Sequence, residues 1–387
     1  MYFFTSITTC YLPKARVLAE TLKKHNPNAI MHLVISDDLP KDFDLQNEDF
    51  DYVWNAEDFI STKNNKQWFY EHTVVELCTA VKPAAALHIF KHTDAKEIVF
   101  LDPDIAVFGS LDALHDELQE NSVLITPHQV DPAVTDAGVR DEEICSLKYG
   151  VFNFGFFAVR RDAEGMRFLN WWNERLMKYC YDDIPNGLFT DQKWGDLIPA
   201  LFACAKVLRN VEYNVATWNL ATRKITGDEN KGWYVNGNPL KFYHFTGFDS
   251  GAHRIMLAQH AKQGDPAWSL SLQYEKWIEE KGQSKLGKIP YKYAFYENGE
   301  KILKEHRLVF RQRTDLQNVF ENPFDDSCYH WMRANLGKLN VKTFMLTYYS
   351  TYIASKLTFG NTRMKFKNRV RIYRSLISQI NNVIMYG

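Results

Sequence analysis

Short apolar runs alternate with longer amphipathic segments along the first half of the chain. Residues 2–7, 30–35 and 98–101 are apolar and β-prone, and they have the length of buried strands. Residues 13–24, between the first two runs, repeat apolar side chains on one face of a helix. This order of strand, helix and strand predicts an α/β fold with a mostly parallel sheet covered by helices.

The same pattern continues with weaker signals. Further strands are expected at 51–54, 123–126, 152–159 and 241–245, and further helices at 69–91, 165–179 and 191–204. Pro83 must kink or split the helix over 69–91, because proline lacks the backbone donor that a helix interior needs. From about Trp268 onward the pattern becomes helical and irregular.

Two acidic residues follow the apolar run 98–101 directly, in the segment Asp102-Pro103-Asp104. In open α/β sheets, ligands bind beyond the carboxyl ends of the strands. Two carboxylates at that place repel each other unless a cation lies between them, and oxygen ligands suit Mg²⁺ and Mn²⁺. The alternative is that both acids only open a turn at Pro103, because a lone Asp-x-Asp is a weak motif.

Composition narrows the classes of protein. The chain has 387 residues, of which 45% are hydrophobic, and this suits one large domain with an appendage or two domains. Its six cysteines show no Cys-x-x-Cys pairing, which favours reduced thiols over disulfides or a zinc site. We expect no signal peptide and no membrane-spanning helix, and hence a cytoplasmic protein.

The net charge of −1 hides a strong asymmetry. No Asp or Glu follows Asp326, whereas ten of the 46 Lys and Arg residues do, so the part before carries 36 basic and all 47 acidic residues. Apolar residues recur at helical spacing over 370–384 beside a cationic face. This pattern predicts adsorption of the tail to an anionic membrane. A solvated helix or docking on the acidic body are the alternatives, and no nucleic-acid-binding module accompanies the charge.

Polar residues also interrupt apolar segments farther along the chain, at Asn153, Asp191, Gln192 and His244. Each alone has a structural explanation: Asp191 as a helix cap, His244 as a core histidine and Asn153 as a turn residue. Together they are polar groups at the ends of elements downstream of the acidic pair, and this favours a functional site.

The segments around these residues resemble GT-A-fold glycosyltransferases that use nucleotide sugars. The segment 100–111 with its Asp-x-Asp, followed in order by Asn153-Phe154-Gly155, Thr190-Asp191-Gln192 and His244-Phe245-Thr246-Gly247, is similar to the retaining family that includes glycogenin and bacterial lipopolysaccharide galactosyltransferases. The resemblance covers roughly residues 1–250 and implies a role for each matched residue. It implies Asp102, Asp104 and His244 as ligands of Mn²⁺ (or Mg²⁺), Thr5 and Ser6 as the cradle of the base, Lys82 and Gly247 as donor contacts, and Asn153, Asp191 and Gln192 as partners of the sugar.

One departure from the family concerns the diphosphate. The family continues from His-x-x-Gly into Lys-Pro-Trp, whose Lys holds the phosphates, whereas this chain continues with Phe248-Asp249-Ser250-Gly251-Ala252-His253-Arg254. The phosphate-binding cation is therefore Arg254 or His253, or it is absent. The anomeric outcome stays open for the same reason.

These observations lead to a functional hypothesis. We expect a GT-A catalytic domain over 1–255, a mostly helical extension over 256–335 and a basic amphipathic tail over 336–387. The expected activity is metal-dependent transfer of a hexose from a nucleotide-diphosphate sugar, with UDP as the expected base, to a glycan or lipid-linked acceptor in bacterial surface polysaccharide synthesis. The enzyme would lie in the cytoplasm or at the inner face of the plasma membrane. A phosphohydrolase of the haloacid-dehalogenase type and a non-catalytic carbohydrate-binding protein are the alternatives.

Overall fold

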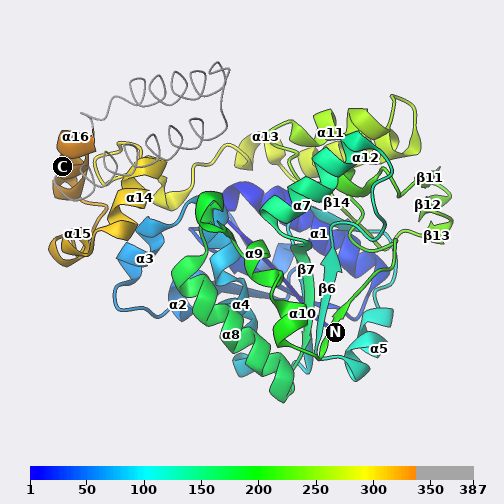
Figure 1. The fold of residues 1–387 in the computed structure, drawn as a ribbon, viewed down its shortest axis with the longest axis horizontal. Coiled ribbons are helices and arrows are strands. Elements are labelled where there is room, and N and C mark those ends of the chain that lie inside the picture. Colours follow the sequence, from blue (N-terminus) through cyan, green and yellow to red (C-terminus); the bar gives the residue numbers. More distant parts are fainter. Residues whose placement is uncertain (337–387) are drawn as a thin grey trace, which may run out of the picture. The chain divides into compact units, whose positions relative to one another are not determined.

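The computed structural model describes residues 1–336, which divide into two units. The first unit comprises Met1–Ser61 and Val74–Lys292, and the second comprises Thr62–Thr73 together with the described residues from Tyr293 to Leu336 (Figure 1). The expected amphipathic helix over 370–384, its membrane adsorption and the basic tail from 337 onward lie outside the described residues.

A seven-stranded sheet forms the centre of the first unit, in the order β10-β6-β7-β4-β1-β2-β3 (Figure 1). Its strands are β1 (Tyr2–Ile7), β2 (Ile30–Ile35), β3 (Tyr52–Asn55), β4 (Glu97–Leu101), β6 (Val123–Pro127), β7 (Phe152–Arg160) and β10 (Ala205–Val207). Neighbouring strands are parallel, except that β7 runs antiparallel to both β4 and β6. The expected α/β fold with a mostly parallel sheet is therefore confirmed.

The late strand expected at 241–245 forms, but it does not join this sheet. β14 (Phe242–His244) pairs antiparallel with the short β5 (Ile105–Val107). The remaining strands form two small antiparallel groups: β8 (Asp182–Asp183) with β9 (Leu188–Phe189), and β11 (Ile225–Asp228) with β12 (Gly232–Val235) and β13 (Asn238–Pro239). Asn236 and Gly237 both adopt positive φ between β12 and β13, as a tight hairpin turn requires.

Twelve α-helical segments are described in the first unit, and several of them are single turns. They are α1 (Leu12–His25), α2 (Ala56–Phe59), α4 (Val74–His92), α5 (Ala113–Glu120), α6 (Asp136–Gly138), α7 (Ile144–Tyr149), α8 (Ala163–Tyr179), α9 (Gln192–Gly195), α10 (Ile198–Leu201), α11 (Ala252–His260), α12 (Pro266–Glu280) and α13 (Gln283–Leu286). Short 3₁₀ turns and one π turn (Val139–Glu143) complete the connections.

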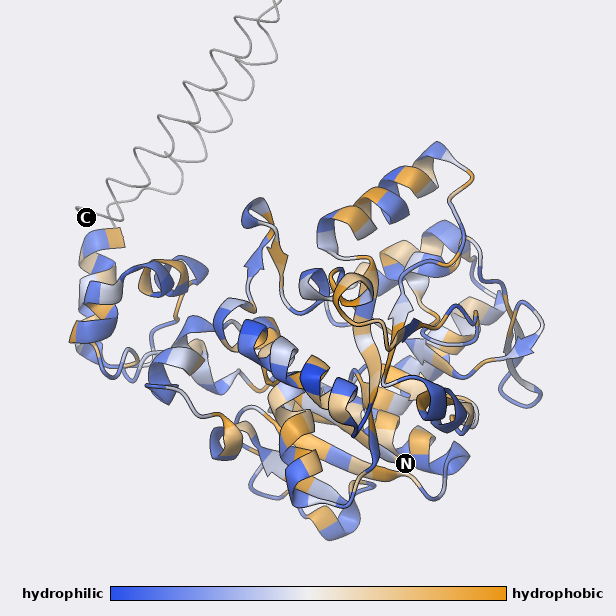
Figure 2. Cartoon of the chain, turned by 60° about the horizontal axis from the view of Figure 1, so that its bottom comes forward, coloured by the Kyte–Doolittle hydropathy of each residue, from blue (hydrophilic) through white to orange (hydrophobic). Residues whose placement is uncertain are grey.

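Both faces of the central sheet are covered because its strands are apolar on both sides. Val99 and Leu101 of β4 belong to the core that includes apolar side chains of α1 and α5. Phe100 points to the opposite face and stacks on Phe157 of β7. The ring of Phe157 in turn packs edge-on against Trp172 of α8, with 5.0 Å between the ring centroids. Figure 2 shows apolar residues concentrated in these central strands. A strand buried on both faces gives the continuous apolar sequence seen at 98–101.

The second unit is helical in its described part, as the sequence predicts. It contains α3 (Asn65–Glu71), α14 (Lys304–Gln312), α15 (Thr314–Val319) and α16 (Asp326–Leu336). Its core combines Tyr70 of α3 with Phe310, Leu316 and Met332 of the C-terminal helices. The hydroxyl oxygens of Tyr70 and Tyr296 lie 2.8 Å apart, so the buried polar atoms of this aromatic core are paired.

Three expectations about element boundaries differ from the structure. The helix expected over 69–91 breaks at His72, which is extended (φ −103°, ψ 134°), and α4 continues through Pro83. The helix expected over 191–204 is two single turns, α9 and α10, because Pro199 starts the second turn. The first unit extends to Lys292 rather than to residue 255, because α12 packs against α1 and β11.

The structure also bears on the expectations about membranes and thiols. None of the helices within residues 1–336 combines the length and the apolar content needed to cross a bilayer. All six cysteines lie within the described residues and are free, as the absence of paired motifs predicts.

Replacing Trp172 tests the packing between α8 and the sheet. Trp172 is fully buried, so Trp172→Ala should lower the free energy of unfolding by about 3–5 kcal/mol. Trp171→Ala is the matched control on the same helix, and it should cost less because Trp171 is only half-buried. Chemical denaturation measures both. Equal losses in the two variants would contradict the assigned packing.

Candidate active site

Asp102, Asp104 and His244 form a group that can bind a metal at the end of β4. Their ligand atoms all lie within 4.8 Å of one another. His244 Nε2 is 3.0 Å from Asp104 Oδ1 and 3.7 Å from Asp102 Oδ2. The pairing of β14 with β5 brings His244 here, because Phe245 N donates to the carbonyl of Asp104 at 2.8 Å.

The electrostatics of this group fit a divalent cation. Burial raises the pKa of Asp102, and Asp104 and Asp191 raise it further, although Lys82 and His244 act against this. Burial also disfavours ionisation of Asp104, but His244 and Lys14 outweigh it and lower the pKa of Asp104. Two carboxylates and an imidazole in this arrangement are suitable ligands for Mn²⁺ or Mg²⁺.

Gly155 makes room for the imidazole of His244. A Cβ atom at Gly155 would lie 2.4 Å from His244 Cε1 and 2.8 Å from Asn153 Oδ1. Gly155 O also accepts a hydrogen bond from Asp102 N at 2.8 Å, so β7 holds the acidic turn in place. Glycine at position 155 is therefore required sterically, because any side chain there would clash with the imidazole of His244.

Lys82 connects the metal group to Asp191. Its ammonium is 3% exposed and donates to Asp191 Oδ2 at 2.8 Å and to Phe154 O at 2.9 Å, with Asp102 Oδ1 at 3.4 Å. Burial alone would lower the pKa of Lys82, but Asp102 and Asp191 raise it above its ordinary value, so the ammonium stays charged. The pair holds the Asp191 carboxylate, which is 2% exposed, in one orientation.

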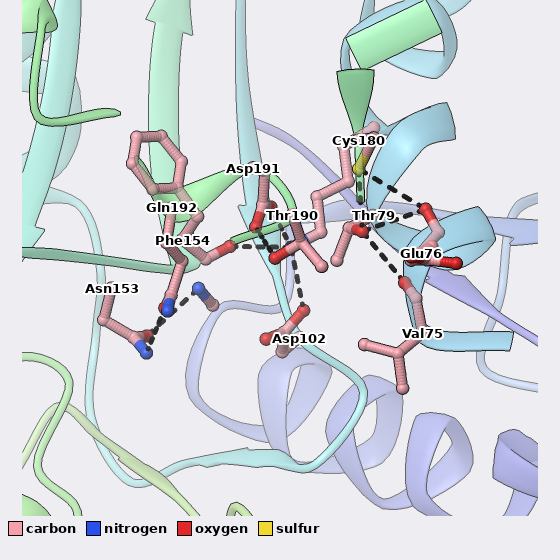
Figure 3. A network of polar contacts seen from close by, with 12 residues as sticks. Val75, Glu76, Thr79, Asp102, Asn153, Phe154, Cys180, Thr190, Asp191 and Gln192 are labelled. Atoms are coloured by element: carbon pink, nitrogen blue, oxygen red, sulfur yellow. Dashed lines mark hydrogen bonds and ion pairs between the residues drawn. The ribbon is translucent and has the colours of Figure 1, made fainter. Parts of the chain in front are cut away.

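Backbone strain is found next to Asp191. Thr190 adopts φ 43°, which is rare for a β-branched residue, and donates from Oγ1 to Asp191 Oδ1 at 3.2 Å (Figure 3). Asn214 adopts φ 52°, is 1% exposed, and donates to Asn153 Oδ1 at 3.0 Å. Strain of this kind persists where the surrounding contacts enforce it, and it is common at functional sites.

Side-chain amides extend from Asp191 toward β7. Asn153 Nδ2 donates to Gln192 Oε1 at 3.2 Å (Figure 3), and Asn153 Oδ1 accepts from Gly155 N at 3.0 Å. Gln192 Nε2 donates to Tyr149 O at the longer distance of 3.4 Å. The structure thus brings the predicted residues Asn153, Asp191 and Gln192 together beside Lys82 and the metal group.

The other predicted residues lie in different settings. Thr5 and Ser6 are buried within β1, and neither hydroxyl has a hydrogen-bond partner among residues 1–336. Gly247 adopts φ 71°, a conformation that favours glycine. Arg254 lies on the exposed face of α11, where its guanidinium bonds to Glu275 at 3.0 Å. His253 is enclosed by aromatic rings, and burial lowers its pKa to about 4.

Sequence reasoning missed two buried charged residues of the first unit. Lys14 of α1 is 1% exposed and forms an ion pair with Asp249. Asp37, after β2, accepts hydrogen bonds from Thr9 N at 2.9 Å and from Thr9 Oγ1 at 3.0 Å. A lysine in the first turn of a helix, where acids are favoured, was the available signal for Lys14.

Comparisons with known proteins give distant likenesses. No family model matches the chain. The uncharacterized protein YfnD of Bacillus subtilis is 23% identical over 257 residues, which cover 64% of this chain and 78% of YfnD. The galactosyltransferase LgtC, solved with donor and acceptor sugar analogs, superposes with a TM-score of 0.42 at 15% identity over 76% of this chain and 99% of LgtC. The glycosyltransferase GlyE of Streptococcus pneumoniae gives a TM-score of 0.41 at 14% identity over 76% of this chain and 66% of GlyE.

Removal of one ligand tests the metal group. Asp104→Asn should weaken Mn²⁺ binding by about 10-fold or more, because one anionic oxygen ligand is lost and His244 loses its partner. Asp112→Asn, at the start of α5, is the control and should leave Mn²⁺ affinity unchanged. Titration calorimetry measures both variants. Unchanged Mn²⁺ affinity in Asp104→Asn would exclude the metal role.

The protonation of His244 gives an independent test. Burial favours neutral His244, but Asp104 and Asp102 raise its pKa above the ordinary value. A proton therefore competes with the cation for Nε2 as the pH falls through this raised pKa. Mn²⁺ affinity should decrease from neutral to mildly acidic pH, and this decrease should be smaller in His244→Ala. A core histidine would instead make His244→Ala less stable without changing Mn²⁺ affinity.

Proposed function

We propose that this chain is a metal-dependent glycosyltransferase that moves a hexose from a nucleotide-diphosphate sugar to an acceptor. The observation that carries the proposal is the metal-binding group of Asp102, Asp104 and His244, joined through Lys82 to the buried carboxylate of Asp191. A charged diphosphate and a sugar ring can be recognised by two such neighbouring groups.

The metal group suits the leaving group of this reaction. A divalent cation held by Asp102, Asp104 and His244 would neutralise charge on the departing phosphate. Without a metal ion, the carboxylates of Asp102, Asp104 and Asp191 are opposed by the protein cations around them, chiefly Lys82 and protonated His244, with Lys14 acting on Asp104. The metal ligands are therefore held in place by protein contacts. Their negative charge favours binding of a cation even before the donor binds.

The groups around Asp191 suit the sugar. Asn153 and Gln192 supply amide donors and acceptors, which match sugar hydroxyls. Asp191 is held by Lys82 and Thr190, so its carboxylate can stabilise positive charge that develops at the anomeric carbon. In an inverting reaction the same carboxylate would be the general base instead.

The finer features of the proposal come from the motif resemblance. We propose UDP as the nucleotide, Mn²⁺ or Mg²⁺ as the cation and a glycan or lipid-linked acceptor in bacterial surface polysaccharide synthesis. We also propose a cytoplasmic location, with peripheral attachment to the inner face of the plasma membrane. The order of the four matched segments supports the donor and the cation, whereas the proposed location rests on the unpaired cysteines and on the basic sequence after Asp326.

The phosphohydrolase alternative fits the site less well. It needs an aspartate free to attack phosphorus, whereas Asp102 and Asp104 contact His244 and Asp191 is bonded to Lys82. No observation within residues 1–336 favours it over glycosyl transfer.

A panel of nucleotide sugars with Mn²⁺ tests the proposal. At least one donor should raise the thermal stability of the protein and be hydrolysed slowly in the absence of an acceptor. Both effects should require Mn²⁺ and disappear in Asp104→Asn. If no nucleotide sugar binds in the presence of Mn²⁺ or Mg²⁺, the proposal is wrong.

The role of Asp191 can be separated from donor binding. Asp191→Asn should lower kcat by about 10²–10³-fold, because the carboxylate charge is lost, while changing donor affinity much less. Asp228→Asn, on the β11–β12 hairpin, is the control and should keep full turnover. Normal turnover in Asp191→Asn would contradict the assigned role, and reduced thermal stability with unchanged kcat would indicate a structural role for the Lys82 pair.

A further inference from the structure

The proposed donor carries two phosphates, and Arg254 and His253 are the cations that the sequence suggests for binding them. Neither residue is in a good position to bind a diphosphate. Arg254 pairs with Glu275 at the surface, and both side chains are more than half exposed. His253 is 1% exposed and packs between the rings of Phe245 and Phe248, with centroid distances of 5.8 Å and 5.3 Å.

Lys14 is placed differently. Its side chain is 1% exposed, and its ammonium lies 3.9 Å above the ring of Tyr11. Its helix, α1, packs against β5, the strand that begins directly after the metal ligand Asp104. Its partner Asp249 lies in the turn that follows β14, five residues after the metal ligand His244. Lys14 is thus a buried cation beside the metal group.

The partner of Lys14 is far more accessible than Lys14 itself. Asp249 forms the ion pair, but its side chain is 42% exposed, and its Oδ1 accepts a hydrogen bond from Gln283 Nε2 at 3.1 Å. A buried ammonium needs an anionic partner at all times, because an unpaired buried charge is strongly unfavourable. A solvent-exposed carboxylate can be replaced by another anion and return to water at little cost.

The position of the pair in the sequence is informative. Asp249 lies two residues after Gly247, in the segment where the resembling family carries its phosphate-binding lysine. In this chain the segment supplies a carboxylate, and the lysine comes from the first turn of α1. Since the positive end of a helix dipole disfavours a lysine there, an anion beside Lys14 offsets an intrinsic cost.

We propose that Lys14 binds the diphosphate of the donor, and that Asp249 is its counter-ion only while the donor is absent. The inference rests on the proposed function, because it assigns a subsite of the same donor. The ligand class is a nucleoside diphosphate with its divalent cation held by Asp102 and Asp104. Arrival of the diphosphate exchanges one anion for another on Lys14, and no covalent bond changes.

Titration calorimetry with UDP at saturating Mn²⁺ tests the assignment. Lys14→Gln should bind UDP about 10- to 100-fold more weakly than the wild type, because a charge-assisted bond is lost, and should bind uridine equally well. Lys23→Gln is the matched control: Lys23 lies on the same helix and pairs with Asp51 at 2.6 Å, so UDP affinity should not change. Asp249→Asn should bind UDP more tightly, because no carboxylate competes for the ammonium.

Each outcome decides the inference. Unchanged UDP affinity in a folded Lys14→Gln overturns it and leaves the proposed function standing, as does a loss of UDP affinity in Arg254→Gln alone. If Lys14→Gln does not fold, Asp249→Asn decides: tighter UDP binding supports the exchange, and equal or weaker binding overturns it. If the wild type binds none of UDP, GDP, ADP, CDP and dTDP with Mn²⁺, the proposed function and this inference both fail.

Discussion

The buried ammonium of Lys82 is the contact that makes the rest of the site possible. It touches both Asp102 and Asp191, which come from segments far apart in the chain. Burial and the neighbouring acids raise the pKa of Asp102, and the ammonium of Lys82 acts against this increase, so it favours the anionic form that a metal ligand needs. Because α4 carries Lys82 and packs against α8 and β1, the charge of the site depends directly on helix packing against the sheet.

The arrangement of the strands positions the remaining metal ligands. β7 is antiparallel to both of its neighbours and places Asn153 and Gly155 beside the acidic turn. There, Gly155 O accepts a hydrogen bond from Asp102 N. The separate pairing of β14 with β5 brings His244 to Asp104. The two interactions fix the acidic turn independently, so the ligands are organised before any cation binds.

The sequence predicts the central strands well, because burial on both faces produces continuous apolar runs such as the one over 98–101. It also predicts that Asn153, Asp191 and His244 converge. It does not predict the break at His72, because this break depends on packing rather than on local propensity, and the helical pattern over 191–204 hides the second start that Pro199 imposes. The partnership of Lys14 with Asp249 could not be foreseen either, since a charge pair between distant segments leaves no periodic signal.

The second unit is assembled from two pieces of sequence separated by most of the first unit. Tyr70 belongs to a core whose other members begin at Tyr296. During synthesis from the N-terminus, the aromatic segment around Tyr70 therefore leaves the ribosome long before its packing partners exist. The first unit can complete its sheet in that interval, whereas this segment must stay exposed or be protected. Biogenesis of this protein thus includes a waiting period that a chain with contiguous domains would not have.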